Sequence, residues 1–550
     1  MDKRSLLAVT LSSLVILVYY TYFFKLPEAS APLPSATISS ESKPSVDTTT
    51  SGVSNTSISF SNSNNSKDSF LIDPDYKNQT TLLQNGLVEA DFESLGGKFK
   101  SFILKKFHQS PEKNSPLVNL FSDKLENLQL IFRESNFSLP TNIPFQLLES
   151  SPTQLVYEWK GPDFILQKTI ELEKENYVAH IRFSLQNLST QTLRGSPTLR
   201  LDTLQNEVHK DSFTFLKGPG NLKFPIQYKD KVTARYRDLT KLGSEKSEKG
   251  DFQWVGIEER YYLWAIIARS LSSENQIRYG ISSNLLFTEL SYPTEVIVPD
   301  AKIEKAFSVY LGPKDVELLK SLNVDLEEAV DYGWFGIVAK PILWLLKFFH
   351  SWVGNWGLAI IVLTIFIKLL LHPINKKSLE SMKGLQKIQP KLKALQEKFA
   401  NDKERLNTEM MNLFKTHKVN PMGGCLPMLL QMPIYIALYK VLYNAIELYH
   451  APFFAFYKDL SAPDPYFVSP ILLGIFMMLQ QRLTPSPSQD PNQAKLMMIM
   501  PLMFSVFMLF LPAGLVIYIF INTSVTVAQQ YLHQKDMSMM DIIQRFRKES

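Results

Sequence analysis

Long stretches without charged side chains follow one another in the second half of the chain. Residues 348–367, 419–439 and 466–481 contain no Asp, Glu, Lys or Arg, and residues 496–534 form a fourth such stretch, 39 residues long. A helix of about 20 apolar residues crosses the hydrocarbon core of a bilayer. The fourth stretch is too long for one crossing, and the sequence LPAG at 511–514 predicts a turn within it, so we expect two helices there.

The N-terminus carries another apolar segment. Residues 5–24 are uncharged, follow Lys3 and Arg4, and would form a helix about 30 Å long. A cleaved signal peptide is the alternative, because the sequence ASA at 29–31 resembles a cleavage site, but the apolar region of a signal peptide usually has only about 7–15 residues. We therefore predict an uncleaved anchor, residues 1–24, and six membrane helices in all. The other five are expected at residues 356–372, 420–442, 465–482, 495–511 and 514–532, within a membrane core that covers 356–535.

A different periodicity fills much of the region between the anchor and these helices. Apolar side chains occupy alternate positions from 177 to 185: Tyr177, Ala179, Ile181, Phe183 and Leu185. Residues two apart share one face of a strand, and segments of this kind recur between turns rich in Gly, Pro, Asn and Asp. The pattern predicts a large all-β sandwich over residues 81–325.

The segment that precedes this domain is polar. Ser, Thr and Asn make up 23 of the 43 residues from 28 to 70. Such a composition cannot bury enough apolar area to offset the entropy lost on ordering. It predicts a disordered linker over residues 25–80.

Aromatic residues gather just before the first core helix. Residues 333–355 are rich in Trp and Phe, with Lys340 and Lys347 between them. This composition is typical of a helix that lies in the headgroup plane, here within an interfacial region 326–355. An early start of the next membrane helix is the alternative.

Residues 375–417 predict two amphipathic helices that close as a hairpin. Apolar residues recur at three- and four-residue steps, and the sequence NDKE at 401–404 supplies a turn and an N-cap. These apolar residues are Leu379, Met382, Leu385, Ile388, Leu392, Leu395 and Phe399 in the first helix, and Leu406, Met410, Leu413 and Phe414 in the second. The polar face is basic. It is either a solvated loop or a docking arm for acidic lipid, ribosomal RNA or a nascent chain.

Lys and Arg are distributed unevenly among the connections. Eleven Lys and Arg lie between Pro373 and Asn420, against five Asp and Glu, whereas the connection 441–465 contains only Lys458. Lys and Arg concentrate in the cytoplasmic loops of membrane proteins. We therefore expect both termini, the hairpin and the tail 536–550 in the cytoplasm, and the β domain on the outer side.

The residue composition and the sequence motifs argue against several kinds of functional site. The chain has one cysteine, Cys425, so it can form neither an intrachain disulfide nor a Cys-based zinc site. The eight histidines have no metal-ligand spacing, and no Gly-rich phosphate loop or nucleophile elbow is present. We expect no cofactor, no metal and no enzymatic activity.

Polar side chains interrupt the apolar segments. Lys368 lies inside the sequence AIIVLTIFIKLLLHP, one helical turn after Thr364, and Gln431 lies in the middle of a later segment. The last segment contains Asn522, Thr523, Ser524 and Thr526, and the stretch 466–481 ends in Gln480 and Gln481. Polar groups at membrane depth normally face protein or a water-filled cavity, which predicts a wet groove. The alternatives are snorkelling of Lys368 to the interface and simple hydrogen bonding between helices.

Four sequences resemble the YidC family of membrane protein insertases: VGNWGLAIIVLTIFIKLLLHPI, KVNPMGGCLPMLLQMPIYIALY, DLSAPDPYFVSPILLGIFMMLQQ and LPAGLVIYIFIN. The resemblance extends almost continuously over residues 330–535. It implies a periplasmic β-supersandwich of the galactose-mutarotase-like type, a five-helix core and a cytoplasmic helical hairpin. It also implies a hydrophilic groove open to cytoplasm and lipid, with a cation, usually Arg, at the position of Lys368. This chain has Lys there, which keeps the charge without the bidentate geometry.

The resemblance implies that the chain inserts and helps to fold proteins of the bacterial inner membrane. The expected partners are nascent membrane proteins, the Sec translocon, the phospholipid bilayer, and the ribosome through the hairpin and the basic tail. The expected client-binding residues are Lys368, Thr364, Gln431, Asn522, Thr523 and Thr526. A membrane-anchored periplasmic protein that binds or modifies sugars is an alternative. A transporter is another, although the internal repeats typical of transporters are not found.

Overall fold

The computed structural model describes residue 76 and residues 78–535, apart from residues 113, 123–124, 126, 141, 206–221, 238–244, 283, 400–401, 418, 420–425, 455 and 485–490. The predicted anchor 1–24, nearly all of the predicted linker 25–80 and the tail 536–550 lie outside the described residues.

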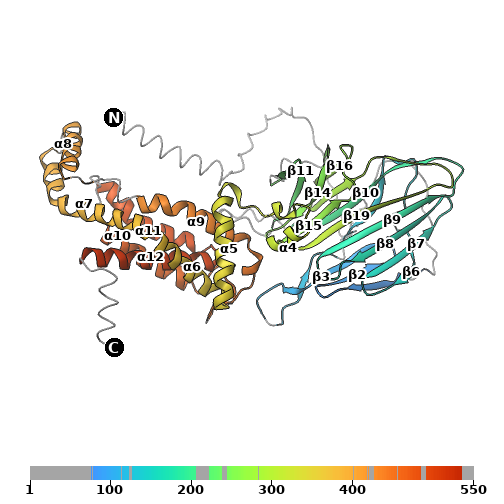
Figure 1. Ribbon diagram of the computed structural model, residues 1–550, viewed down its shortest axis with the longest axis horizontal. Helices are drawn as coiled ribbons and strands as arrows, with labels where there is room; N and C mark the ends of the chain where they lie inside the picture. The colour runs from blue at the N-terminus through green and yellow to red at the C-terminus, as the bar shows by residue number, and fades with distance from the viewer. Residues whose placement is uncertain are drawn as a thin grey trace, which may run out of the picture. The chain divides into compact units, whose positions relative to one another are not determined.

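An antiparallel β domain begins at Thr80 and ends at Pro313 (Figure 1). Its largest sheet has nine strands in the order β12-β11-β14-β15-β19-β9-β8-β7-β6, and all of its pairings are antiparallel. The strands are β6 (Gln146–Ser150), β7 (Gln154–Lys160), β8 (Phe164–Leu172), β9 (Val178–Asn187), β11 (Phe224–Lys229), β12 (Val232–Arg235), β14 (Phe252–Glu258), β15 (Tyr262–Ala268) and β19 (Lys302–Pro313). The prediction of a large all-β domain is confirmed.

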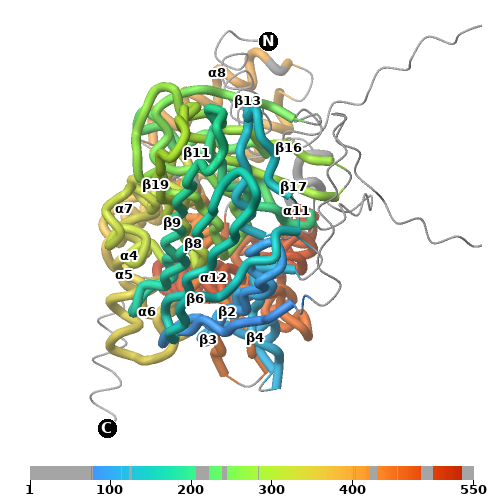
Figure 2. Tube along the Cα trace, turned by 90° about the vertical axis from the view of Figure 1, so that its right-hand side faces the viewer, coloured from blue at the N-terminus to red at the C-terminus, as the bar shows by residue number. Residues whose placement is uncertain are grey.

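Two smaller sheets complete this domain. One has the order β13-β16-β17-β10-β18, with β5 paired to β10, and the other has the order β1-β2-β3-β4. Figure 2 shows β2, β3 and β4 together in blue. The strands are β1 (Thr80–Gln84), β2 (Val88–Glu93), β3 (Lys98–His108), β4 (Leu117–Asn119), β5 (Gln129–Arg133), β10 (Leu193–Leu204), β13 (Lys246–Lys249), β16 (Gln276–Ser282), β17 (Leu285–Ser291) and β18 (Glu295–Ile297).

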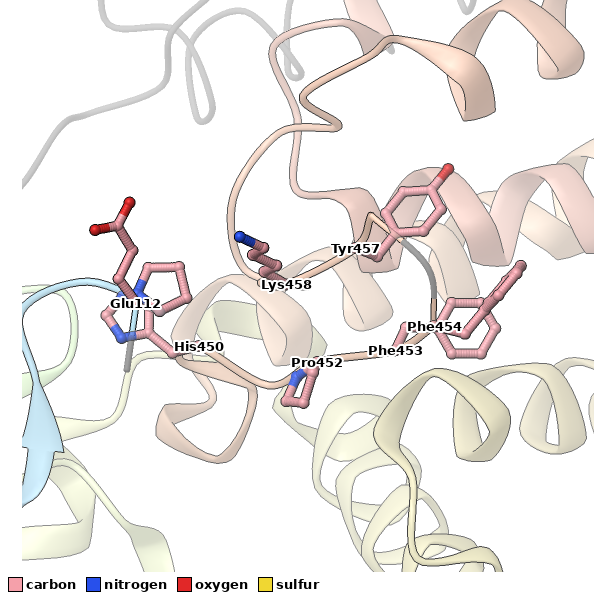
Figure 3. Close-up of a pocket in the computed structure, with 8 residues that line it drawn as sticks. Glu112, His450, Pro452, Phe453, Phe454, Tyr457 and Lys458 are labelled. Atoms are coloured by element: carbon pink, nitrogen blue, oxygen red, sulfur yellow. The ribbon is translucent and has the colours of Figure 1, made fainter. Parts of the chain in front are cut away.

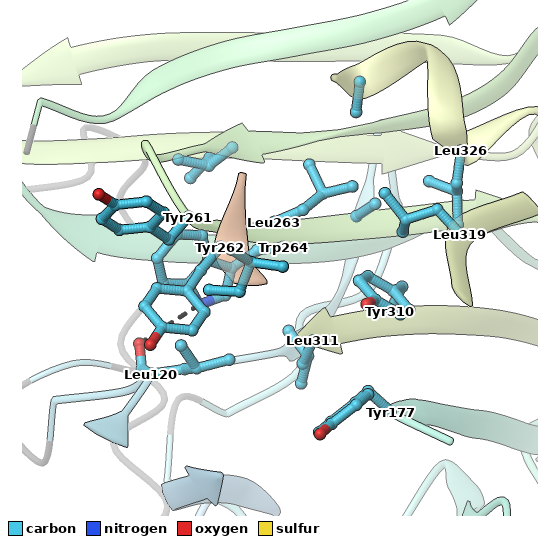
Figure 4. Close-up of a cluster of buried hydrophobic side chains, with 14 of the residues drawn as sticks. Leu120, Tyr177, Tyr261, Tyr262, Leu263, Trp264, Tyr310, Leu311, Leu319 and Leu326 are labelled. Atoms are coloured by element: carbon cyan, nitrogen blue, oxygen red, sulfur yellow. Dashed lines mark hydrogen bonds between the residues drawn. The ribbon is translucent and has the colours of Figure 1, made fainter. Parts of the chain in front are cut away.

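The core of the β domain follows from the two-residue alternation in its strands. In β9, Ile181, Phe183 and Leu185 are buried, as the sequence pattern predicts, whereas Arg182 is exposed. Figure 4 shows a part of this core in which the Nε1 atom of Trp264 donates a hydrogen bond to the Leu120 carbonyl oxygen at 3.3 Å. Burying this indole is favourable because its polar N–H finds an acceptor.

One lysine of the β domain is buried with the apolar side chains. Lys168 of β8 is only 2% exposed, and its Nζ atom donates hydrogen bonds to the carbonyl oxygens of Gly97 at 2.6 Å and Leu128 at 3.4 Å. Gly97 and Leu128 both have positive φ, so each carbonyl belongs to a tight turn. Lys168 therefore ties two turns to the nine-stranded sheet. Burial lowers the pKa of Lys168 to about 7.

We expect the stability of the β domain to rise with pH because of Lys168. Above a pKa of about 7 the folded chain releases a proton that the unfolded chain keeps up to about pH 10.4. From about pH 7.5 to about pH 9.5, the wild type should therefore gain about 2 kcal/mol of unfolding free energy relative to Lys168→Met. Urea unfolding followed by tryptophan fluorescence measures this difference. Parallel pH profiles of the two proteins would contradict it.

Helices dominate after the β domain (Figure 1). A short helix α4 (Val316–Ser321) and two 3-10 turns lead into them. The later helices are α5 (Gly336–Val353), α6 (Trp356–Leu370), α7 (His372–Lys398), α8 (Lys403–Thr416), α9 (Leu426–Asn444), α10 (Val468–Leu483), α11 (Pro491–Met508) and α12 (Ala513–Gln534). The break between α11 and α12 at residues 509–512 confirms a turn within the long uncharged stretch, but Ala513 and Gly514 of the turn predicted at 511–514 already belong to α12. Gly354, with a φ of 66°, ends α5, and Asn355 caps α6, so α5 is a separate helix.

The described helices differ in their capacity to cross a bilayer. Judged by length and composition, α12 is long and apolar enough to do so, and α6 with α7 would be a second span if the pair, bent by 65°, is counted as one. Helix α10 and residues 499–508 of α11 are shorter apolar segments. The predicted number of six membrane helices therefore stays a prediction.

Helices α7 and α8 pack against each other as the predicted hairpin. Leu385, Ile388 and Leu392 of α7 form a separate buried cluster with Phe414 of α8. Asp402 caps α8 by accepting a hydrogen bond from the backbone N–H of Arg405 at 3.1 Å, as the sequence NDKE predicts. This cluster lies apart from the main core and holds the hairpin by its own contacts.

Candidate functional site

Three helices bring polar side chains together inside the helical core. Each carries polar residues four apart, which places them on one helix face: Thr364 and Lys368 on α6, Gln431 and Tyr435 on α9, and Tyr518, Asn522 and Thr526 on α12. We call Lys368, Thr526, Asn522, Tyr435, Gln431 and Tyr518 the polar cluster.

Lys368 forms one end of the polar cluster. Its side chain is 7% exposed, and its Nζ atom donates a hydrogen bond to the Thr526 hydroxyl at 2.7 Å. That hydroxyl donates in turn to the backbone carbonyl of Asn522 at 2.7 Å. No carboxylate of the described residues forms an ion pair with Lys368. A buried ammonium group whose hydrogen-bond partner in the described part of the chain is a neutral hydroxyl keeps much of its capacity to attract an anion.

Two further hydrogen bonds join α9 to α12. The amide of Gln431 donates to the Tyr518 hydroxyl at 2.9 Å, and the amide of Asn522 donates to the Tyr435 hydroxyl at 2.6 Å. The two tyrosine rings meet edge to face, with their centroids 5.8 Å apart at 88°. This arrangement satisfies polar groups of the buried Gln431, Asn522 and Tyr518 and of the half-buried Tyr435, and it fixes the spacing of the two helices.

Of the other polar residues that the sequence singled out, Thr364 and Thr523 are buried and Ser524 and Gln480 are half-buried, and the hydrogen bonds that the structure describes for them do not join this network. The Thr364 hydroxyl donates to the Ile360 carbonyl of its own helix at 2.6 Å. Thr523 is buried on α12, and Ser524 donates to the Phe520 carbonyl of the same helix at 2.8 Å. Gln480 accepts a bond from the Thr484 backbone through its carbonyl. The structure therefore brings together Lys368, Gln431, Asn522 and Thr526 of the predicted set.

Sequence reasoning missed the two tyrosines of the polar cluster. Tyr435 follows Gln431 by four residues, and Tyr518 precedes Asn522 by four, so the spacing was available as a signal. Tyrosine is common in apolar segments, however, and its hydroxyl becomes informative only when another buried polar group lies opposite.

The surface of the helical core is apolar, in contrast to the polar cluster in its interior. Helices α6, α10 and α11 expose large hydrophobic side chains, among them Leu369, Leu370, Ile471, Ile475, Leu502 and Met503. Such a surface is stable in lipid and unfavourable in water. Together with the buried polar cluster, it defines an integral membrane protein that also carries a large all-β domain.

Known proteins place the chain within that class. Two family models match it: the 60Kd inner membrane protein over residues 348–540 and the YidC periplasmic domain over residues 81–345. A protein of Syntrophus aciditrophicus named Membrane protein insertase YidC is 36% identical over 97% of this chain and 100% of its own length. Its namesake from Geobacter sulfurreducens is 37% identical over 81% of this chain and 84% of its own length. The chain belongs to the YidC family.

Solved structures show weaker similarity. A crystal structure of an active YidC insertase with its first transmembrane domain resolved is 18% identical, covers 82% of this chain and 92% of its own, and has a TM-score of 0.37. A galactose mutarotase related enzyme from Lactobacillus acidophilus is 11% identical, covers 42% of this chain and 97% of its own, and has a TM-score of 0.32.

Proposed function

We propose that this chain is a membrane protein insertase and that the polar cluster contacts its clients. The Syntrophus aciditrophicus relative, which matches this chain over its whole length, carries that name. The observation that supports the site most directly is Lys368, a buried cation without a carboxylate partner among the described residues, set in helices with an apolar exterior. The cluster would act as the polar lining of a groove open to cytoplasm and lipid.

The physical problem is the transfer of polar client segments through hydrocarbon. A charged side chain at the bilayer centre costs at least about 2.5–3.5 kcal/mol on insertion scales. A hydrated groove with a fixed cation lowers this cost for an acidic tail. When the client carboxylate leaves bulk water, it meets the ammonium group of Lys368 instead of the hydrocarbon of the lipid. Partition of the client's own apolar helix into lipid then supplies the driving force. No bound nucleotide is required for these steps.

We propose further that six helices cross the inner membrane, with both termini and the hairpin in the cytoplasm and the β domain in the periplasm. The charge distribution among the connections supports this orientation. Helix α10 has 16 residues and is therefore about 24 Å long, shorter than a hydrocarbon core of about 30 Å. A short span of this kind thins the bilayer locally and lowers the barrier next to the polar cluster.

We assign helix α5 to the periplasmic interface. Trp334, just before it, is 88% exposed, and Trp344 and Trp352 on α5 are exposed as well. The opposite face buries Leu343 and Leu346 against the core. Trp prefers the headgroup level because its ring is amphipathic.

We assign contact with the ribosome to the hairpin α7–α8 and to the basic tail, and cooperation with the Sec translocon to the membrane core. The hairpin supports this assignment by its exposed lysines, whose positive field favours RNA and acidic lipid.

Depletion of the chain tests the insertase function. We expect small phage-coat-like membrane proteins to remain sensitive to protease added to the cytoplasmic side when the chain is depleted, and to become inserted again when it is restored from a plasmid. A secreted soluble protein serves as the control for general export. Unchanged insertion after complete depletion would refute the proposed function.

Single cysteines test the proposed orientation in a Cys425→Ser background. A membrane-impermeant thiol reagent added to intact spheroplasts should label Lys302→Cys in the β domain and leave Ala394→Cys in the hairpin unlabelled. Both positions are exposed to solvent, so access to the side chain is not limiting. Labelling of Ala394→Cys without labelling of Lys302→Cys would contradict the proposed orientation and indicate the opposite one.

A further inference from the structure

A cavity of about 610 Å³ lies away from the polar cluster. One wall comes from Pro111 and Glu112 in the connection between β3 and β4. The other comes from the connection between α9 and α10 and consists of His450, Pro452, Phe453, Phe454, Tyr457 and Lys458 (Figure 3). The proposed insertion mechanism does not use this cavity.

The lining of the cavity divides into a polar end and an aromatic end. Figure 3 shows Glu112 and His450 together at one end, Lys458 between the two ends, and the rings of Phe453 and Phe454 at the other. A lining of this kind suits an amphiphile whose charged part and apolar part occupy opposite ends.

The aromatic end is attached to the start of a core helix. Asn355, the N-cap of α6, donates a hydrogen bond to the Phe453 carbonyl oxygen at 3.0 Å. A Cβ atom at Gly357 would collide with the Phe453 ring, so the ring packs directly on the first turn of α6. Phe454 is 63% exposed. With α6 crossing the bilayer as proposed, the start of this helix and the aromatic end beside it lie at the depth where lipid headgroups meet hydrocarbon.

The polar end is held in place by contacts from the β domain. The Tyr449 ring packs against Tyr261 and Tyr262, with centroid distances of 4.8 and 6.1 Å. Arg260 donates hydrogen bonds to the Tyr443 carbonyl at 2.9 Å and to the Ser461 carbonyl at 3.4 Å. Both ends of the connection are therefore fixed, and the cavity has a defined shape.

The charges that line the cavity are one carboxylate and one ammonium group. Glu112 and Lys458 are exposed to solvent and form no ion pair with another described residue. Burial lowers the pKa of His450, against the opposing effect of Asp459, so its imidazole is neutral at pH 7. The lining thus has no net charge, which suits a zwitterion better than an anion.

We propose that this cavity binds the headgroup of a zwitterionic aminophospholipid. Lys458 takes the phosphate, Glu112 takes the lipid's ammonium group, and Phe453 and Phe454 contact the glycerol and the first acyl methylenes. A bound lipid would link the β3–β4 connection to the α9–α10 connection. This binding is independent of the client contacts of Lys368, so the two proposals fail separately.

Native mass spectrometry of the purified full chain tests the proposal. The probes are phosphatidylethanolamine and phosphatidylglycerol with identical acyl chains. The wild type should retain phosphatidylethanolamine about fivefold more than phosphatidylglycerol, and Lys458→Gln or Glu112→Gln should remove most of this preference. Glu112→Lys should shift it toward the anionic lipid. Lys302→Gln, on the exposed surface of the β domain, is the charge-matched control and should behave as wild type.

Two results would overturn the proposal. The first is equal retention of both lipids by the wild type, or a preference that Lys458→Gln and Glu112→Gln leave unchanged. The second concerns the source of the headgroup. Glycerophosphoethanolamine, which lacks acyl chains, should compete poorly, and competition at concentrations equal to those of the lipid would identify a soluble ligand instead of a lipid.

Discussion

Replacing Lys368 by methionine is expected to slow the insertion of clients with acidic translocated tails about tenfold, which corresponds to about 1.4 kcal/mol. Methionine keeps a similar length and apolar stem but removes the charge. Clients with neutral tails should be affected much less, because they do not use the cation. The measurement is the amount of protease-protected client in vesicles that contain matched amounts of each variant.

Two further variants separate the charge from the structural role of the side chain. Lys368→Arg should preserve insertion, because both side chains are cationic at pH 7. Combining Thr526→Lys with Lys368→Met should restore part of the activity, since Thr526 lies 2.7 Å from the Lys368 ammonium and can present a cation at nearly the same place. Thr364 suits this purpose less well, because its side chain is completely buried and bonded to Ile360. Equal defects for acidic and neutral tails would leave Lys368 as an ordinary structural lysine.

Asp464→Ala is expected to destabilise the helical core by about 3 kcal/mol or more. Asp464 is buried in the connection between α9 and α10. Its carboxylate accepts four hydrogen bonds: from the Tyr457 hydroxyl at 2.9 Å, from the Tyr466 backbone at 3.0 Å, and from the backbone and hydroxyl of Ser469, both at 2.7 Å. Alanine would leave these donors without an acceptor. Thermal unfolding of the purified chain measures the effect, and Asp251→Ala, at an exposed position of the β domain, is the control.

The same substitution should also alter function, in a pattern different from that of Lys368→Met. The connection that Asp464 holds pairs with the start of α12, where Ala513 and Gly514 donate backbone hydrogen bonds to Ala462 and Leu460. Helix α12 carries Asn522 and Thr526, so a shift of its start moves the polar cluster as a whole. We expect clients with acidic and neutral tails to lose insertion to the same degree. A loss of insertion confined to clients with acidic tails would show that Asp464 acts through the charge of Lys368 and not through the position of α12.

Local periodicity predicted the kinds of segment in this chain. Alternation at 177–185 became strand β9, and the turn predicted at 511–514 became the break at 509–512 between α11 and α12. The α7–α8 hairpin and its cap at Asp402 were equally available, because capping and amphipathic spacing depend on residues within a few positions of one another. The boundary between α6 and α7 was predicted less accurately: the predicted membrane helix 356–372 ends two residues beyond α6, and the hairpin predicted from residue 375 begins at His372 after a bend of 65°.

The sequence by itself also determined which helix faces are polar, because residues four apart lie on one face whatever surrounds them. The sequence could not determine which side chains of other helices pack against each polar face. Thr526 lies 158 residues from Lys368, and Tyr435 lies 87 residues from Asn522, so these pairs depend on how the helices pack. The same holds for the acceptors around Lys168 and for the cavity between the β3–β4 and α9–α10 connections. Only the tertiary structure decided these contacts, because a buried polar group is stabilised by whichever partner packing brings within hydrogen-bond distance.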